Sequence, residues 1–151
     1  MTNQPLVTVL LNCYNEEKNI KKCVSSILKQ TYKNWELIVL DDASLDNTVK
    51  IIKKIKDKRI RLYQNLKNLG LGKSRIKAQR YIKGKYVTII DGDDFFEKKK
   101  IKEQVEILNR NSNIGLVSTW TKILNSKDKK VIREFKSYKN NNHIKKNLFY
   151  L

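Results

Sequence analysis

The run Asp91-Gly92-Asp93-Asp94 contains the residues of this chain that are best suited to chemistry. It follows residues 86–90 (Tyr-Val-Thr-Ile-Ile), an apolar stretch that predicts a buried strand. Three carboxylates within four residues repel one another unless a cation or hydrogen-bond donors compensate their charge. At a strand end they suit a hard divalent metal, which takes oxygen ligands and is usually shared with a substrate phosphate. The alternative is an acidic surface turn, since Asp and Gly are ordinary turn residues.

Polar clusters also follow two other apolar stretches. Residues 12–16 (Asn-Cys-Tyr-Asn-Glu) come after the stretch 6–11, whose nearly continuous apolar character predicts a strand buried on both faces. Asp41 and Asp42 come after residues 35–40 (Trp-Glu-Leu-Ile-Val-Leu). Each cluster therefore lies at the end of a predicted strand.

Helices are predicted between these strands. Apolar residues at positions 20, 23, 24, 27 and 28 share one helical face and predict a helix over 19–30. Asp46 or Asn47 can cap a second helix, and the glycine-containing turn 68–72 precedes a third that runs to about residue 83. The remaining predictions are strands over 60–63, 115–120 and 130–135, a helix that contains Ile101, Val105 and Leu108, a loop over 137–142 and a helix over 143–151.

The alternation of strands with helices predicts an α/β fold. Strands joined by helices pair in parallel through right-handed crossovers, and such sheets bind ligands beyond the carboxyl ends of their strands. The three polar clusters should therefore meet at one edge of the sheet. A surface turn does not explain three such clusters on one edge, so their arrangement favours a binding site. The 151 residues suit a single domain.

The formal net charge of +18 is the second unusual property of the chain. Basic surfaces bind nucleic acid by releasing counterions from phosphates. The lysines are nevertheless spread over nearly every segment, and there is no zinc finger, RNP-like motif or basic region followed by heptads. We therefore expect no nucleic-acid partner. The charge would instead attract anionic ligands and an acidic membrane surface.

The sequence favours a cytoplasmic location. No apolar run reaches membrane-spanning length, and no basic segment precedes the run at 6–11 as a secretory signal would require. Cys13 and Cys23 are the only cysteines, and no second pair or nearby His completes a zinc pattern. A disulfide between them is not expected in a reducing compartment.

Five segments, in order, resemble the nucleotide-sugar-binding half of a family 2 glycosyltransferase with the GT-A fold. The resemblance covers about residues 6–117 and implies a Rossmann-like, mostly parallel sheet flanked by helices and incomplete at the C-terminus. Within a single domain, 1–120 would form the core and 121–151 the start of the acceptor-side region. The matching segments are 9–17 (VLLNCYNEE), 26–32 (SILKQTY), 35–48 (WELIVLDDASLDNT), 68–75 (NLGLGKSR) and 84–94 (GKYVTIIDGDD).

By this resemblance, the first two clusters form the nucleotide pocket. Asn12, Cys13, Tyr14 and Glu16 would line it, partly through main-chain groups, although Asn12 stands where many members of the family carry Pro. Asp42 would accept a hydrogen bond from an imide N–H of the base. We interpret Cys13 as acting through its backbone.

The third cluster resembles the family's metal-binding Asp-x-Asp element. By that resemblance Asp93 would bind Mn²⁺ or Mg²⁺ bridging the two phosphates, while Asp91 would hold the ribose or share the metal, and Gly92 would lie against the nucleotide sugar. Arg75 matches an arginine often found near the nucleotide, and Lys73 could reach a phosphate.

Structural roles remain as alternatives for several of these residues. Asp41 is better explained as a helix or turn cap than as a ligand contact. Asp94 can either cap the next helix or belong to the site, and the sequence favours neither role. Arg75 and Lys73 can also be solvated helix charges.

The resemblance implies transfer of a sugar from a metal-bound nucleoside diphosphate sugar, most simply a UDP-sugar, to a glycan or lipid-linked acceptor. Cell-envelope polysaccharide synthesis at the inner face of a membrane, with peripheral attachment, fits the charge. In related enzymes the catalytic base lies far downstream of the metal motif, so we expect the base and acceptor site to be absent here.

Three alternatives remain open. The first is a nucleotide-sugar-binding fragment or partner subunit without catalysis. The second is a partner protein that docks through its basic surface. The third is a phospho-acceptor receiver domain, which also clusters Asp residues at strand ends but fits the Asp-x-Asp spacing less well.

Overall fold

The computed structural model describes residues 4–125 and 130–135. The chain divides into two compact units, Met1–Val105 and Glu106–Leu151. The predicted loop over 137–142 and the predicted helix over 143–151 lie outside the described residues. No helix among the described residues is both long and apolar enough to cross a membrane.

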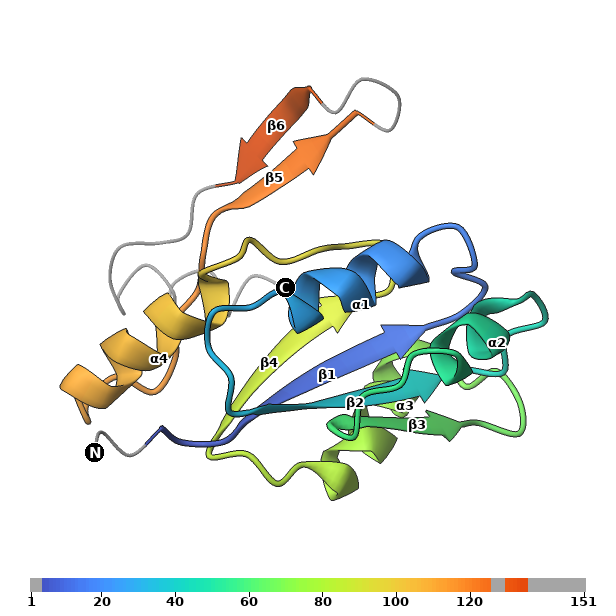
Figure 1. Ribbon diagram of the computed structural model, residues 1–151, viewed down its shortest axis with the longest axis horizontal. Coiled ribbons are helices and arrows are strands. Elements are labelled where there is room, and N and C mark those ends of the chain that lie inside the picture. The colour runs from blue at the N-terminus through green and yellow to red at the C-terminus, as the bar shows by residue number, and fades with distance from the viewer. Residues whose placement is uncertain (1–3, 126–129, 136–151) are drawn as a thin grey trace. The chain divides into compact units, whose positions relative to one another are not determined.

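The first unit is built on a four-stranded parallel sheet with the strand order β3-β2-β1-β4 (Figure 1). This confirms the predicted α/β class and its parallel pairing. The strands are β1 (Val7–Cys13), β2 (Trp35–Asp41), β3 (Ile60–Gln64) and β4 (Tyr86–Asp91). The helices are α1 (Ile20–Leu28), α2 (Thr48–Lys53), α3 (Leu71–Ala78), the 3₁₀ turn η1 (Gln79–Tyr81) and α4 (Lys100–Arg110), which continues past Val105.

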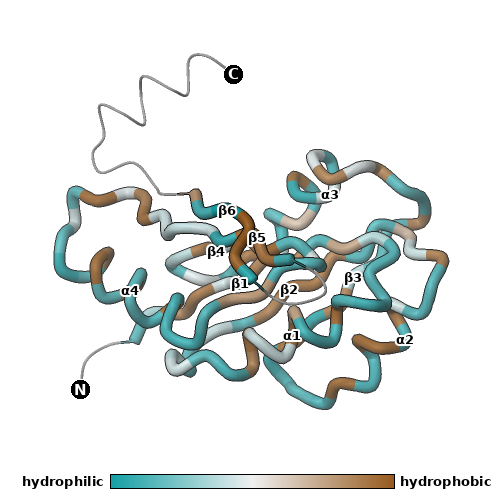
Figure 2. The backbone as a smooth tube through the Cα atoms, turned by 90° about the horizontal axis from the view of Figure 1, so that it is seen from above, coloured by the Kyte–Doolittle hydropathy of each residue, from teal (hydrophilic) through white to brown (hydrophobic). Residues whose placement is uncertain are grey.

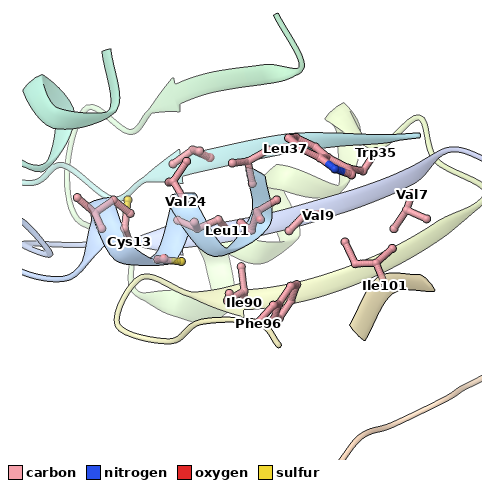
Figure 3. Packing of buried hydrophobic residues seen from close by; sticks show 14 of the residues in the cluster. Val7, Val9, Leu11, Cys13, Val24, Trp35, Leu37, Ile90, Phe96 and Ile101 are labelled. Carbon is pink, nitrogen blue, oxygen red and sulfur yellow. The ribbon is translucent and has the colours of Figure 1, made fainter. Parts of the chain in front are cut away.

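Burial of apolar side chains on both faces holds the central strands in place. On one face Val9 and Leu11 of β1 pack with α1, together with Ile90 and Phe96 (Figure 3). On the other face, Leu10 and its β2 neighbours pack against Ala78 of α3. Figure 2 shows this apolar character along β1 and β2. The buried run predicted at 6–11 is thus explained by helices on both sides of its strand.

The register brings the carboxyl ends of three strands level. Asn12 of β1 is aligned with Leu40 of β2 and with Asp91 of β4, and Cys13 is aligned with Asp41. In a parallel sheet these ends lie on the same edge. The polar residues that follow β1, β2 and β4 therefore emerge side by side.

Two sequence predictions about strands are wrong. Residues 86–90 form the predicted strand, but it is not a buried one, because β4 is an outer strand of the described sheet and leaves Val87 and Ile89 46% and 49% exposed. Residues 115–120 are not a strand, although they are apolar enough. In the second unit the strand is β5 (Thr121–Leu124), whose antiparallel partner is β6 (Val131–Phe135). This ladder begins at Thr121, after the predicted stretch.

Candidate functional site

A cavity of about 390 Å³ lies at the carboxyl ends of β1, β2 and β4. It unites residues from all three polar clusters and from the start of α3, so Asp42 and Asp93 face the same space. The predicted site residues that line it are Asn12, Cys13, Tyr14, Glu16, Asp42, Asp91, Gly92 and Asp93. Four further lining residues are Asn68, Gly70, Leu71 and Ser74.

Hydrogen bonds tie the loop after β1 to the loop after β2 and to the start of α2. The backbone N–H of Asn15 donates to Ser44 Oγ at 2.9 Å, and that of Glu16 donates to Thr48 Oγ1 at 2.7 Å. Both loops use left-handed backbone at a residue other than glycine, with φ of 55° at Asn15 and 66° at Ala43. Such strain persists only where surrounding contacts impose it. The two loops are thus held as one rigid wall of the cavity.

Asp41 has the capping role that the sequence favoured. Its buried carboxylate accepts hydrogen bonds from the backbone N–H of Ser44 at 3.0 Å and from the Ser44 hydroxyl. The Cys13 thiol donates to the same carboxylate at 3.8 Å. Burial, and then the Asp41 charge, raises the pKa of the Cys13 thiol far above its ordinary value. Cys13 therefore stays protonated and is a poor nucleophile.

Asp42 holds the start of α3 against the sheet. Its Oδ1 atom accepts hydrogen bonds from Asn65 Nδ2, Ser74 Oγ and the backbone N–H of Leu69, at 2.7, 2.8 and 2.9 Å. Its Oδ2 atom accepts one from the backbone N–H of Gly70 at 2.8 Å. Burial alone would raise the pKa of Asp42, but these four donors outweigh it and lower the pKa. Oδ2 accepts only this one bond from the described residues, so it can still accept one from a ligand.

Arg75, a predicted site residue, does not line the cavity but contacts Asp91, which does. Its Nη2 atom lies 2.5 Å from Asp91 Oδ1, which joins α3 to the end of β4. Its Nε atom is buried and has no hydrogen-bond partner among the described residues. Asp91 is therefore already paired with a cation. Lys73 is exposed and does not line the cavity.

Gly92 lets the acidic run approach the first loop closely. A Cβ atom at this position would lie 2.8 Å from Glu16 Cγ and 3.1 Å from Cys13 Cβ. Any larger residue would push the run away from β1. The close contact with Glu16 and Cys13 therefore explains why a glycine lies between Asp91 and Asp93.

Within the described part of the chain, the charge of Asp94 is not fully compensated. Burial, and then the charges of Asp93 and Asp91, raises the pKa of Asp94. Burial, and then the charges of Asp94 and Asp93, also raises the pKa of the Cys23 thiol to about 12. The negative potential at this end of the cavity would be relieved by a cation. The capping alternative for Asp94 is wrong, because the next helix begins only at Lys100.

The residues present fit a cation that is shared with its ligand. Among the described residues no group of three His, Cys, Asp or Glu side chains could hold a metal ion. Mg²⁺ and similar ions, however, usually bind one or two carboxylates together with substrate phosphates and water. Asp93 is exposed and lines the cavity, so it is the carboxylate best placed for that role.

Sequence reasoning placed Asn12 in the site but missed its unpaired side chain and the contribution of the start of α3. Asn12 is 4% exposed, and neither atom of its side-chain amide has a hydrogen-bond partner among the described residues. Ser74 and Gly70 contact both Asp42 and the cavity. Gly70 lies in the predicted turn 68–72 and Ser74 lies in the helix after it, so the glycine-containing turn was the available signal.

Known proteins resemble most of the chain. Residues 8–150 match the family described as Glycosyl transferase family 2. An uncharacterized glycosyltransferase of Methanocaldococcus jannaschii is 38% identical over 141 residues, which cover 91% of this chain and 48% of the relative. The Escherichia coli enzyme UDP-Glc:alpha-D-GlcNAc-diphosphoundecaprenol beta-1,3-glucosyltransferase WfgD is 36% identical over 121 residues, covering 80% of this chain and 47% of the relative.

Solved structures share the fold. The S. aureus TarS 1-349 structure in complex with UDP-GlcNAc has a TM-score of 0.66 and 25% sequence identity, and the match covers 78% of this chain and 40% of that one. The chain spans about half the length of the curated relatives it matches.

Proposed function

Because this chain belongs to glycosyl transferase family 2, we propose that its cavity binds the donor of a sugar-transfer reaction. The donor is a nucleoside diphosphate sugar, a UDP-sugar by preference, bound together with Mn²⁺ or Mg²⁺. The sugar passes to a glycan or lipid-linked acceptor in cell-envelope polysaccharide synthesis. The named donor and lipid-linked acceptor of WfgD, and the UDP-GlcNAc bound to TarS, support this assignment.

One observation carries the proposal: complementary groups lie along a single cavity. Asp42 follows β2 and Asp91 ends β4, and β1 separates these two strands. Two strand spacings, about 10 Å, therefore separate the two sides of the site. That distance is comparable to the length of a nucleoside. The base would donate its imide N–H to Asp42 Oδ2, and the ribose would bind near Asp91, leaving the diphosphate for Asp93.

The departing nucleoside diphosphate must have its charge neutralised. A divalent cation held by Asp93 would supply that charge and act as a Lewis acid. Arg75 contributes by holding Asp91 in place, and the linked loops after β1 and β2 keep the cavity in shape. An inverting transfer also needs a carboxylate base for the acceptor hydroxyl. We assign that base to no described residue, so the proposed role of this cavity is donor binding.

The net charge supports a peripheral membrane location for the reaction. A charge of +18 favours contact with anionic lipids at the cytoplasmic face of a membrane. A lipid-linked acceptor would be presented at the same surface. We therefore place the proposed reaction in the cytoplasm, at the inner face of the membrane.

Isothermal titration calorimetry with UDP-sugars and GDP-sugars, with and without Mn²⁺, tests the proposal. We expect UDP-sugars to bind more tightly with Mn²⁺, and Asp93→Ala to reduce that metal-dependent affinity at least tenfold. Glu103→Ala, which removes an exposed carboxylate of α4 outside the cavity, is the matched control and should bind like the wild type. Absence of binding by the wild type, or unchanged binding by Asp93→Ala, would refute the proposal.

A further inference from the structure

Asn12 has a buried polar side chain that forms no hydrogen bond with the described residues. It is 4% exposed, and both its Oδ1 and Nδ2 atoms are without a hydrogen-bond partner among the described residues. Native proteins pair nearly all buried polar groups, because an unpaired one costs the free energy of its lost hydration. Asn12 also lines the cavity, so a bound molecule could complete its hydrogen bonds.

The strand geometry shows which way Asn12 points. Side chains two residues apart on a strand share a face. Leu10 packs against Ala78 of α3, so Asn12 lies on the α3 face of the sheet too. The same face carries Asp42 and Asp91, because α3 residues contact both carboxylates. Since β1 lies between β2 and β4, Asn12 is on the cavity floor between the two acidic side chains.

The neighbouring groups define what Asn12 can recognise. Asp42 is held ionised by its four donors and can therefore only accept a hydrogen bond from a ligand. Asn12 can donate through Nδ2. An acceptor beside a donor complements a ring N–H next to a ring carbonyl, which is the imide edge of uracil. Cytosine has an acceptor in place of that N–H and would oppose the Asp42 carboxylate.

We propose that Asn12 reads the base of the donor nucleotide: its Nδ2 atom donates to a carbonyl of the uracil imide whose N–H donates to Asp42. This inference rests on the proposed function. It makes Asn12 a specificity residue, and it explains why a buried amide is kept unpaired in the protein without ligand. The Nδ2 atom of this amide gains its partner when the nucleotide binds.

Asn12→Leu separates a binding role from a packing role. Leucine is close to asparagine in size and has no polar atoms, so it removes the unpaired groups without opening a large cavity. A residue kept for packing or folding would lose stability on this change. A residue kept for the ligand would lose affinity for the base while the protein unfolds at the same or a higher temperature.

The test is calorimetry with UDP, CDP and inorganic pyrophosphate, each with Mn²⁺, together with thermal unfolding. We expect the wild type to prefer UDP over CDP at least tenfold. Asn12→Leu should bind UDP at least tenfold more weakly and pyrophosphate unchanged. Asn12→Asp, which has the same shape but no donor, should also lose UDP affinity, and it carries the test if the leucine variant does not fold.

The outcomes distinguish this inference from the proposal beneath it. A wild type that binds no nucleotide overturns both. A wild type that binds UDP while both variants bind it equally well overturns only the role of Asn12. Equal losses of UDP and pyrophosphate affinity would also overturn that role, because they would place the contact at the phosphates.

Discussion

Asp42→Asn should destabilise this protein strongly although it changes the shape of one side chain very little. Asparagine keeps Oδ1 as an acceptor for Asn65, Ser74 and the N–H of Leu69, but these bonds lose the help of the negative charge. Its Nδ2 atom would face the N–H of Gly70, donor against donor. Rotating the amide does not help, because the other position faces three donors.

The magnitude follows from these four bonds. Hydrogen bonds to charged groups contribute about 1.5–3 kcal/mol and neutral ones about 0.5–1.5 kcal/mol. One lost bond therefore costs about 2 kcal/mol and each of the three weakened bonds about 1 kcal/mol, which amounts to about 5 kcal/mol. That is a large part of the stability of an ordinary domain, about 5–15 kcal/mol. Since Asp42 also positions α3, nucleotide affinity should fall as well.

Urea unfolding followed by circular dichroism measures the effect. The midpoint should move to lower urea while the slope stays the same, because the surface exposed on unfolding is unchanged. Asp93→Asn is the control: it removes an exposed carboxylate of the same cavity and should change stability by less than about 0.5 kcal/mol. A loss below about 1 kcal/mol for Asp42→Asn would refute this account of how α3 is held, given the cost of unsatisfied buried donors.

Two further predictions concern backbone strain and acid. Ala43→Gly should raise the free energy of unfolding, measured in urea titrations, by about 0.5–1 kcal/mol. Left-handed backbone (φ 66°) costs alanine roughly 1–2 kcal/mol, and the larger conformational entropy that glycine loses on folding cancels part of the gain. A loss of stability would contradict this prediction. Burial opposes ionisation of Asp42 and Glu36, yet donated hydrogen bonds lower both pKa values. Their contribution is therefore present above the unfolded-state pKa near 4 and lost as pH falls through the lower folded values. The free energy of unfolding should therefore fall between pH 5 and pH 3. Unchanged stability over that range would count against the role of these two carboxylates.

Local patterns were sufficient to predict the layers of the fold. The apolar runs before Asn12, before Asp41 and before Asp91 became three parallel strands, and the helical spacing of residues 20–28 became α1. Strand β6 also lies where it was predicted. The apolar pattern did not predict where the next strand begins, because strand pairing determines its bounds. Residues 115–120 were apolar enough for a strand, but the ladder with β6 begins at Thr121. The apolar pattern of residues 86–90 likewise did not show that Val87 and Ile89 of β4 are exposed.

What the sequence determined by itself was which residues meet: parallel strands joined by helices bring their carboxyl ends to one edge, so Asn12, Asp42 and Asp93 had to line a common space. Only the tertiary structure decided what each does there. Asp42 is bonded to four donors on α3 and the segment before it, Asp91 is paired with Arg75, and Asn12 is buried without a partner. Hydrogen bonding depends on distances between side chains far apart in the chain, and no local pattern encodes those distances.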